Sequence, residues 1–296
     1  MNARTTLLAA LIAVLLGLNV YQYSRSQTAA PTAAATSEMP HVSASAPDAS
    51  EGSVPAEAED AAGDRDADAG GDEAPAQPVP QKIAQRFHRA FVKSRALLKN
   101  SWFGIKTWQH PFDAWITQEI IWEVKPDFIV ETGTFHGGSA ALWATLIEHT
   151  NPEGRVISID AFDFLDPAVI ELPVVKRRVE FLRGSSSSPE TFAEVEKRVK
   201  GKKVLVILDS DHHKEHVLGE MRGFAPMVSV GSYLIVQDTH LGDSMPFWML
   251  KTGRWDPGPM KAIDAFMETN QDFEIDASRE RLAATNNHRG FLKRIR

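Results

Sequence analysis

The sequence predicts an α/β fold over residues 101–296, a doubly wound and mostly parallel sheet with helices on both faces. Short apolar runs with β-branched centres alternate there with segments of helix length. The first such run leads into a glycine-rich turn and then into a dense apolar segment. Four of the runs end on acidic or amide side chains. Parallel strands would bring these side chains to one edge of the sheet, where such folds bind ligands.

Composition limits the classes of function. The chain has 296 residues, of which 43% are hydrophobic, enough for one sizeable core. It has no cysteine, which excludes disulfides, thiolate nucleophiles and cysteine-bound zinc. The net charge of -7 arises in residues 26–80, with eleven acids and one base, while residues 81–296 are close to neutral. We therefore expect no nucleic-acid partner.

Residues 1–25 predict a membrane anchor or a signal segment. Leu7–Val20 is almost wholly apolar, and the segment Thr5–Tyr23 is about nineteen residues long, enough to cross a bilayer core of ~30 Å. A single-pass anchor that holds the protein at a membrane is one interpretation. The alternative is a secretory signal cleaved near residues 28–30, which would give a secreted or periplasmic protein.

Two further segments precede the α/β domain. Residues 26–80 predict a disordered acidic linker, because Ala, Pro, Ser, Gly and acids dominate and no Phe, Trp or Tyr occurs. Residues 81–100 predict a basic amphipathic helix, which either packs on the domain or lies on anionic lipid. Its apolar face is expected to hold Ile83, Phe87, Phe91 and Leu98, and its bases are Lys82, Arg86, Arg89, Lys93, Arg95 and Lys99.

The elements of the domain follow from apolar runs and the residues that bound them. The expected strands are 128–131, 155–160, 179–183, 203–208, 232–236, 273–275 and 290–295. The expected helices are 114–124, 140–150, 189–199, 213–223 and 259–268.

The turn after the first strand has the spacing E-x-G-x-x-x-G-x-S, from Glu131 to Ser139. Glycines allow the backbone to approach a ligand closely. An acid at the strand end would repel a pyrophosphate, but it suits a cofactor with ribose hydroxyls and a cationic amino-acid end. S-adenosylmethionine (SAM) fits that description. The alternative is an ordinary turn in another doubly wound protein.

Two more strand ends support a nucleoside site. Asp160 ends the second strand, where a carboxylate can accept hydrogen bonds from both ribose hydroxyls. The third strand leads into Gly184-Ser185-Ser186-Ser187-Ser188-Pro189, a loop of small residues that can lie along an adenine. One of its serines is expected to cap the next helix.

The fourth and fifth strands end on Asp209 and on Gln237-Asp238. These oxygen ligands suit Mg²⁺, and histidines nearby would allow Mn²⁺ or Fe²⁺. The alternative is that the acids stabilise helix N-termini. His212, His213, His216 and His240 follow the same strand ends. His212 and His216 are spaced i, i+4, and one of them or His240 is the expected general base; the sequence does not rank them.

These motifs together resemble the cephalosporin hydroxylase and rhamnosyl O-methyltransferase family of class I SAM-dependent methyltransferases. The resemblance covers about residues 101–296 and implies a Rossmann-like sheet of the class I methyltransferase type. The residues that carry it are Gln109-His110-Pro111, Asp113, Lys125-Pro126-Asp127, Glu131-Thr132-Gly133-Thr134, Gly137-Gly138-Ser139, Ile159-Asp160, Gly184-Ser185-Ser186, Leu208-Asp209-Ser210-Asp211-His212 and Gln237-Asp238-Thr239.

The resemblance implies residues for a cofactor and a metal. With the turn motif, it gives a SAM-binding set of Glu131, Gly133, Thr134, Gly137, Ser139, Asp160, Ser185, Ser186 and Asp209. It implies a divalent ion, Mg²⁺ being the first candidate, on Asp209, Gln237 and Asp238. Gln237 is a departure from metal-dependent relatives, because a neutral amide donates less charge than a carboxylate.

The implied activity is O-methyl transfer from SAM to a hydroxyl of a sugar, glycolipid or secondary metabolite, with Asp209, His212 and His240 as catalytic candidates. Residues 240–259, with Phe247, Trp248 and Trp255, are expected to form a lid. SAM is a cytoplasmic metabolite, so we expect the domain to face the cytoplasm. A homo-oligomer is compatible with the sequence. The alternatives are a non-catalytic SAM- or nucleotide-binding module and a membrane-tethered assembly protein.

Overall fold

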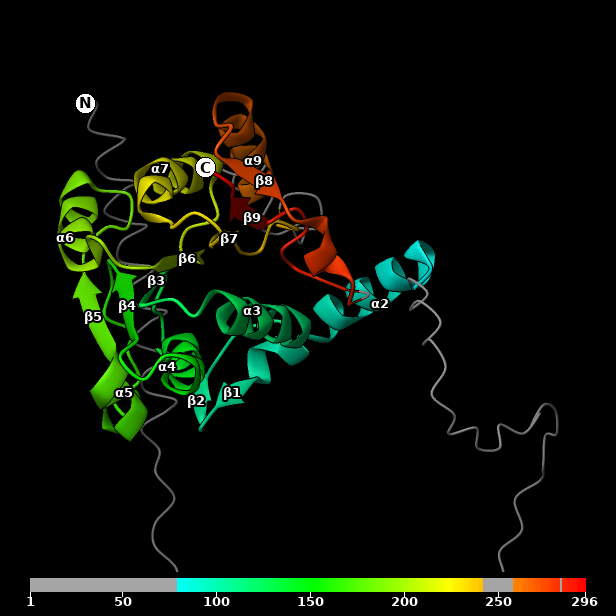
Figure 1. Ribbon diagram of the computed structural model, residues 1–296. Helices are drawn as coiled ribbons and strands as arrows, with labels where there is room; N and C mark the ends of the chain where they lie inside the picture. The colour runs from blue at the N-terminus through cyan, green and yellow to red at the C-terminus, as the bar shows by residue number, and fades with distance from the viewer. Residues whose placement is uncertain (1–78, 242–257, 283) are drawn as a thin grey trace, which may run out of the picture. The chain divides into compact units, whose positions relative to one another are not determined.

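The computed structural model describes residues 79–241, 258–282 and 284–296, as a seven-stranded sheet with helices on both faces (Figure 1). The expected anchor or signal, nearly all of the linker and most of the expected lid lie outside the described residues. No helix in the described part of the chain is long and apolar enough to cross a membrane.

The sheet has the strand order β5-β4-β3-β6-β7-β9-β8. Its strands are β3 (Phe128–Thr132), β4 (Arg155–Asp160), β5 (Val179–Arg183), β6 (Val204–Leu208), β7 (Tyr233–Val236), β8 (Phe273–Ile275) and β9 (Phe291–Arg294). The pairs from β5 to β7 are parallel, and β9 pairs antiparallel with both β7 and β8. The prediction of a mostly parallel α/β sheet is confirmed.

The helices agree with the sequence except near residue 95 and at α5, which was not predicted. They are α2 (Gln81–Ser94), α3 (Pro111–Val124), α4 (Gly138–Thr150), α5 (Pro173–Arg178), α6 (Pro189–Val199), α7 (Lys214–Phe224) and α9 (Gly258–Thr269), with 3₁₀ turns η1 (Ala96–Lys99), η2 (Val169–Glu171), η3 (Ala225–Met227) and η4 (Ala277–Glu280). The expected basic helix is divided, because Arg95 is left-handed (φ 55°) and ends α2 before η1. The hairpin β1 (Ser101–Trp102) and β2 (Ile105–Lys106), together with α5, was not predicted.

Successive side chains of a strand lie on opposite faces of the sheet, so the strands contribute to two apolar cores, one on each face. Ile129 of β3 joins a core with α3 and α4, which contains the fully buried Trp143. Its neighbour Val130 joins the opposite core, with α6, α7 and α9. Both faces of β3 are thus covered, which explains its continuous apolar run. The strand ends remain accessible at the carboxyl edge.

The inward face of α2 differs from the predicted one. Ile83 and Phe87 are 58% and 45% exposed, so they do not form the packing face. The half-buried residues of the helix are Ala84, His88, Phe91 and Val92. The Phe91 ring lies edge-on to His110, 4.7 Å between centroids. The helix therefore packs on the domain through these four residues, while Ile83 and Phe87 face outward.

Candidate active site

A cavity of about 570 Å³ opens at the carboxyl edge of the parallel strands. Residues that follow β3, β4, β5, β6 and β7 all contribute to its wall. Most of the predicted site residues line it: Gly133, Thr134, Ser139, Asp160, Ser185, Ser186, Asp209, His212 and Asp238. The grouping of strand-end side chains into one site therefore agrees with the structure.

Gly133 is required where β3 meets β6. Its φ is +86°, and a Cβ there would lie 1.9 Å from the backbone oxygen of Asp209. Gly138 is equally close to the β2 segment, because a Cβ would lie 2.2 Å from the Lys106 carbonyl oxygen. Gly137, also expected to bind the cofactor, instead precedes α4 as its left-handed N-cap and does not line the cavity. Its glycine serves the turn conformation.

Glu131 supports the site from behind the cavity wall. Its carboxylate is fully buried and accepts hydrogen bonds from Trp143 Nε1 (2.8 Å) and Ser158 Oγ (2.6 Å). Burial raises the pKa of Glu131 to about 7, against the lowering effect of Ser158, Ser139 and Trp143. The expectation that Glu131 contacts the cofactor directly is corrected, because its bonds and complete burial assign it to positioning α4 and β4.

Asp160 lies at the tip of β4 with its carboxylate on the cavity. Its oxygens accept hydrogen bonds from the backbone N–H groups of Phe135 (2.9 Å) and Phe162 (2.8 Å). These bonds fix the carboxylate and leave lone pairs for ribose hydroxyls. Phe135 also lies against Trp108, with ring centroids 4.6 Å apart. An aromatic wall therefore flanks the predicted ribose position, and the sequence did not predict it.

The serines of the loop after β5 have two roles, because one caps helix α6 and another lies in the cavity wall. Ser188 caps α6, its Oγ accepting from Thr191 N (3.2 Å). Ser186 lies in the cavity wall, 3.1 Å from Nε2 of His216. The buried Glu220 carboxylate, 3.3 Å from that nitrogen, raises the pKa of His216. His216 is thus tied to the serine loop and to α7, which leaves His212 as the freer histidine.

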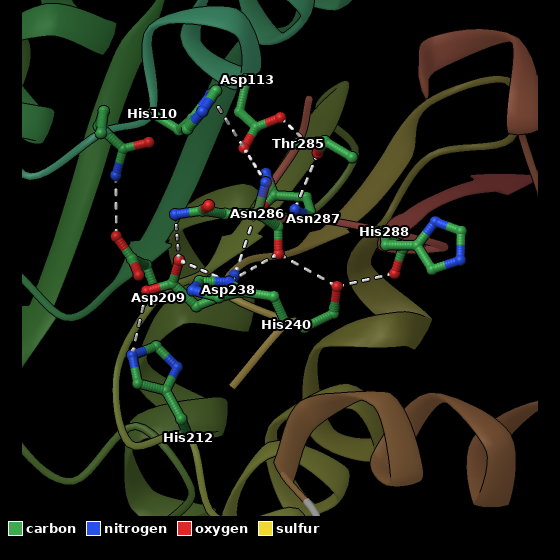
Figure 2. A network of polar contacts seen from close by, with 12 residues as sticks. His110, Asp113, Asp209, His212, Asp238, His240, Thr285, Asn286, Asn287 and His288 are labelled. Atoms are coloured by element: carbon green, nitrogen blue, oxygen red, sulfur yellow. Dashed lines mark hydrogen bonds and ion pairs between the residues drawn. The ribbon is translucent and has the colours of Figure 1, made fainter. Parts of the chain in front are cut away.

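Asp209, His212 and Asp238 converge at one end of the cavity (Figure 2). Each offers one ligand atom, and these atoms lie within 4.8 Å of one another. Asp209 Oδ2 also accepts a hydrogen bond from Gln109 Nε2 (2.8 Å). Burial, with the Asp238 and Glu131 carboxylates nearby, holds the pKa of Asp209 well above its usual range. Two close carboxylates with a histidine beside them form a site suited to a divalent metal.

Gln237 does not line the cavity. Its side chain is buried, and its Nε2 has no hydrogen-bond partner among the described residues. His212 Nε2 instead lies 3.6 Å from Asp238 Oδ2. His212 thus stands with the two aspartates on the cavity wall, and Gln237 stays a predicted ligand whose side chain is buried.

A polar network behind Asp238 links the site to the last part of the chain (Figure 2). Asp238 is left-handed (φ 54°), and its N–H donates to Asn287 Oδ1 (3.0 Å). Asn286 Nδ2 donates to Asp238 Oδ1 (3.1 Å), and the Asn286 N–H donates to Asp113 Oδ2 (2.8 Å). Burial raises the pKa of Asp113 to about 7. The two asparagines were missed because they follow no predicted strand end.

His240 lies in this network and not in the cavity wall. Its Nδ1 is 3.3 Å from the Asn286 carbonyl oxygen and 3.8 Å from Asp238 Oδ1. Its ring meets His88 of α2 edge-on at 5.3 Å. Of the three histidines that the sequence left unranked, His212 and His216 line the cavity and His240 does not.

Comparisons with known proteins identify the family of this chain. A sequence profile of the family described as rhamnosyl O-methyltransferase/CmcI matches residues 94–295. A rhamnosyl O-methyltransferase of Mycobacterium tuberculosis is 33% identical over 220 residues, covering 72% of this chain and 85% of the relative. That of Mycobacterium leprae is 33% identical over 223 residues, covering 72% and 90%.

A solved structure of CmcI described with Mg and SAM is 21% identical to this chain, with a TM-score of 0.48. It covers 67% of this chain and 78% of that one. The family expected from the sequence is confirmed by the profile and by the mycobacterial relatives. The chain belongs to the rhamnosyl O-methyltransferase/CmcI family.

Proposed function

We propose that the protein transfers the methyl group of SAM to an acceptor hydroxyl. The S–CH₃ bond breaks as the O–CH₃ bond forms, S-adenosylhomocysteine leaves, and the hydroxyl proton passes to a base. The observation that carries this proposal is one cavity with a nucleoside-type end at Asp160 and a carboxylate–histidine end at Asp209, His212 and Asp238. Membership of an O-methyltransferase family supports the same reaction.

The nucleoside end is built for the cofactor. Asp160 would bind the ribose hydroxyls, and the Ser185–Ser186 loop with Phe162 would border the adenine. Gly133, which lines the cavity and lets the end of β3 approach Asp209 closely, would border the methionine end. Glu131 would act indirectly, by holding Ser139 and Ser158 in place.

The opposite end would hold a divalent metal, Mg²⁺ first, on Asp209 and Asp238. Such an ion, when bound, lowers the pKa of a coordinated hydroxyl and orients it. Within this chain, Gln109 fixes the Asp209 carboxylate and Asn286 fixes that of Asp238. With the ion on the two aspartates alone, Nε2 of His212, in the cavity wall beside Asp238, would be the base that accepts the acceptor proton.

The acceptor would be a sugar hydroxyl of a glycan or glycolipid. The mycobacterial relatives are named for methylation of a rhamnosyl group, which makes a deoxysugar the first acceptor to test.

The test is calorimetric titration of the full chain with SAM, with and without Mg²⁺. Asp160→Ala should abolish the SAM signal, and Asp209→Ala should abolish the metal signal while SAM still binds. Glu196→Ala, which removes an exposed carboxylate on α6, is the matched control and should change neither signal. Absence of SAM binding to the wild-type protein would reject the proposal. SAM binding without methyl transfer to any rhamnoside would favour a non-catalytic SAM-binding module.

We also propose that Leu7–Val20 anchors the chain in a membrane with residues 79–296 in the cytoplasm, where SAM is made. The apolar length of that segment supports an anchor. Reporter fusions at Arg296 test the orientation. A fusion that is active only outside the cytoplasm would contradict it.

A further inference from the structure

The outward side of α2 continues onto α3 as an exposed apolar surface. Ile83 and Phe87 lie one turn apart on α2, and Phe112 and Trp115 one turn apart on α3. The Phe87 and Phe112 rings stack at 6.0 Å between centroids, which joins the two pairs. Trp115 is 62% exposed, more than either α2 residue. We call these four residues the apolar stripe; Ile83 and Phe87 precede the profile match, which begins at residue 94, and Phe112 and Trp115 lie within it.

A row of cations runs along α2 beside the apolar stripe. Lys82, Arg86, Arg89 and Lys93 are spaced four, three and four residues apart, so they share one helical face. All four are exposed, and none forms an ion pair with a described carboxylate. No acid occurs in residues 79–100. We call these four residues the basic row, and it lies opposite the face of α2 that packs on the domain.

We propose that the apolar stripe and the basic row together form a docking surface for an anionic membrane. Cations attract anionic headgroups, and phenylalanine and tryptophan side chains at the border of the basic face enter the region between headgroups and acyl chains. The charge of the surface is complementary to such a membrane and to no neutral one. This proposal does not depend on methyl transfer.

Docking would bring lipid close to the acceptor end of the cavity. The inward face of α2 carries His88, whose ring contacts His240 at 5.3 Å. His240 in turn lies 3.8 Å from Asp238. One helix therefore has the proposed lipid surface on one side and the margin of the carboxylate–histidine site on the other. An acceptor attached to a lipid would reach the site without leaving the membrane.

The test uses the full chain, which has no cysteine and so accepts a single spin label at any chosen site. Ala90→Cys places the label between the apolar stripe and the basic row, and Ala193→Cys on α6 is the control position; both residues are exposed. Power saturation is measured with O₂ and with a water-soluble nickel chelate. The vesicles are phosphatidylcholine, alone or with a third phosphatidylglycerol. With vesicles that contain phosphatidylglycerol, we expect the label at residue 90 to become more accessible to O₂ and less accessible to the nickel chelate. With pure phosphatidylcholine vesicles, its accessibility should not change. The label at residue 193 should not change with either kind of vesicle.

Charge variants distinguish membrane binding by this surface from membrane binding by the apolar N-terminal segment, because the variants leave that segment unchanged. The double variant Arg86→Glu/Arg89→Glu should reduce the population with a buried label about tenfold or more. The matched variant Lys200→Glu/Lys202→Glu changes the net charge equally at another exposed site and should have no effect.

Three results would overturn the proposal. A label equally buried on neutral vesicles would show that anionic lipid is not the ligand. A label shielded without vesicles and released by salt would assign the surface to the acidic residues 26–80 of the chain itself. Dipolar broadening between labels in solution would assign it to a second copy of the chain.

Discussion

The Glu131 carboxyl group predicts a specific dependence of stability on pH. Burial raises its folded-state pKa from 4.5 to about 7. An acid with a raised folded pKa binds more protons folded than unfolded, so the free energy of unfolding falls as pH rises between these values. Glu131→Gln removes this term while keeping an acceptor oxygen. The free energy of unfolding of the variant minus that of wild type should therefore rise by about 3 kcal/mol from pH 4.5 to pH 7. Urea unfolding at several pH values measures this, and a constant difference would contradict it.

Gly133 and Gly201 form a matched pair, because both have positive φ and only one is crowded. A Cβ at Gly133 meets the Asp209 carbonyl, whereas one at Gly201 meets nothing within 4 Å. Gly201→Ala should cost about 1 kcal/mol from backbone strain. Gly133→Ala should cost about 3 kcal/mol or more and abolish SAM binding, because β3 and β6 must separate. Thermal unfolding and SAM titration of both variants check this, and equal losses would refute the close approach.

At this scale the sequence predicted the residues that end strands and missed those that support them. Asp160, Asp209 and Asp238 follow apolar runs, so topology alone places them together. Asn286 and Asn287 follow no such run and reach Asp238 only through the antiparallel return of the chain. Gln237 also follows an apolar run, yet its side chain is buried and does not line the cavity.

Among the elements, α6 offers a test of capping that is separate from binding. Ser188→Ala should lower the free energy of unfolding by about 1 kcal/mol, because the Thr191 N–H loses its acceptor. The SAM affinity should not change. Ser186→Ala, in the same loop but in the cavity wall, should weaken SAM binding and leave the free energy of unfolding unchanged. Unfolding and titration of both variants distinguish these roles, and a shared phenotype would show that the loop acts as one unit.

The carboxyl edge of β6 and β7 predicts proton competition with the metal. Because the pKa of Asp209 is raised, this carboxylate should take up a proton at a higher pH than an ordinary aspartate. Metal affinity should therefore weaken as pH falls, by up to about tenfold per pH unit for one competing proton. Mn²⁺ titration followed by electron paramagnetic resonance between pH 5 and 8 measures this. Asp209→Asn should flatten the dependence, and an unchanged affinity in wild type would contradict it.

Elements with a strong apolar period were predictable, and those set by tertiary contacts were not. The strands β3, β4 and β6 are covered on both sides, and their runs are unmistakable. The β1–β2 hairpin has two residues in each strand and is placed by packing of Trp102, whose Nε1 donates to Thr145 on α4. The break after α2 depends on one left-handed arginine, for which the sequence carries no glycine or asparagine signal.

For the whole described unit, binding of the cofactor should raise the free energy of unfolding. A ligand that contacts the ends of β3, β4 and β5 binds only when these strands are assembled. At a hundredfold excess over its dissociation constant it should add about 2.7 kcal/mol to the free energy of unfolding. For a domain of this size that corresponds to a rise in Tm of roughly 5–10 °C. Thermal unfolding with SAM tests this. Asp160→Ala should show no rise, and a rise of equal size there would place the ligand elsewhere.

The position of β9 between β7 and β8 has a consequence for how the protein is made. β8 has no neighbour until β9 is in place, and Asp238 has no asparagine partners until residues 286–287 have been synthesised. A nascent chain can form the parallel half of the sheet while still on the ribosome, but its metal-binding end must wait for the final residues. The ability to bind the cofactor should therefore appear earlier during synthesis than catalytic activity. A chain halted before residue 286 should bind the nucleoside part of the cofactor but should not catalyse methyl transfer.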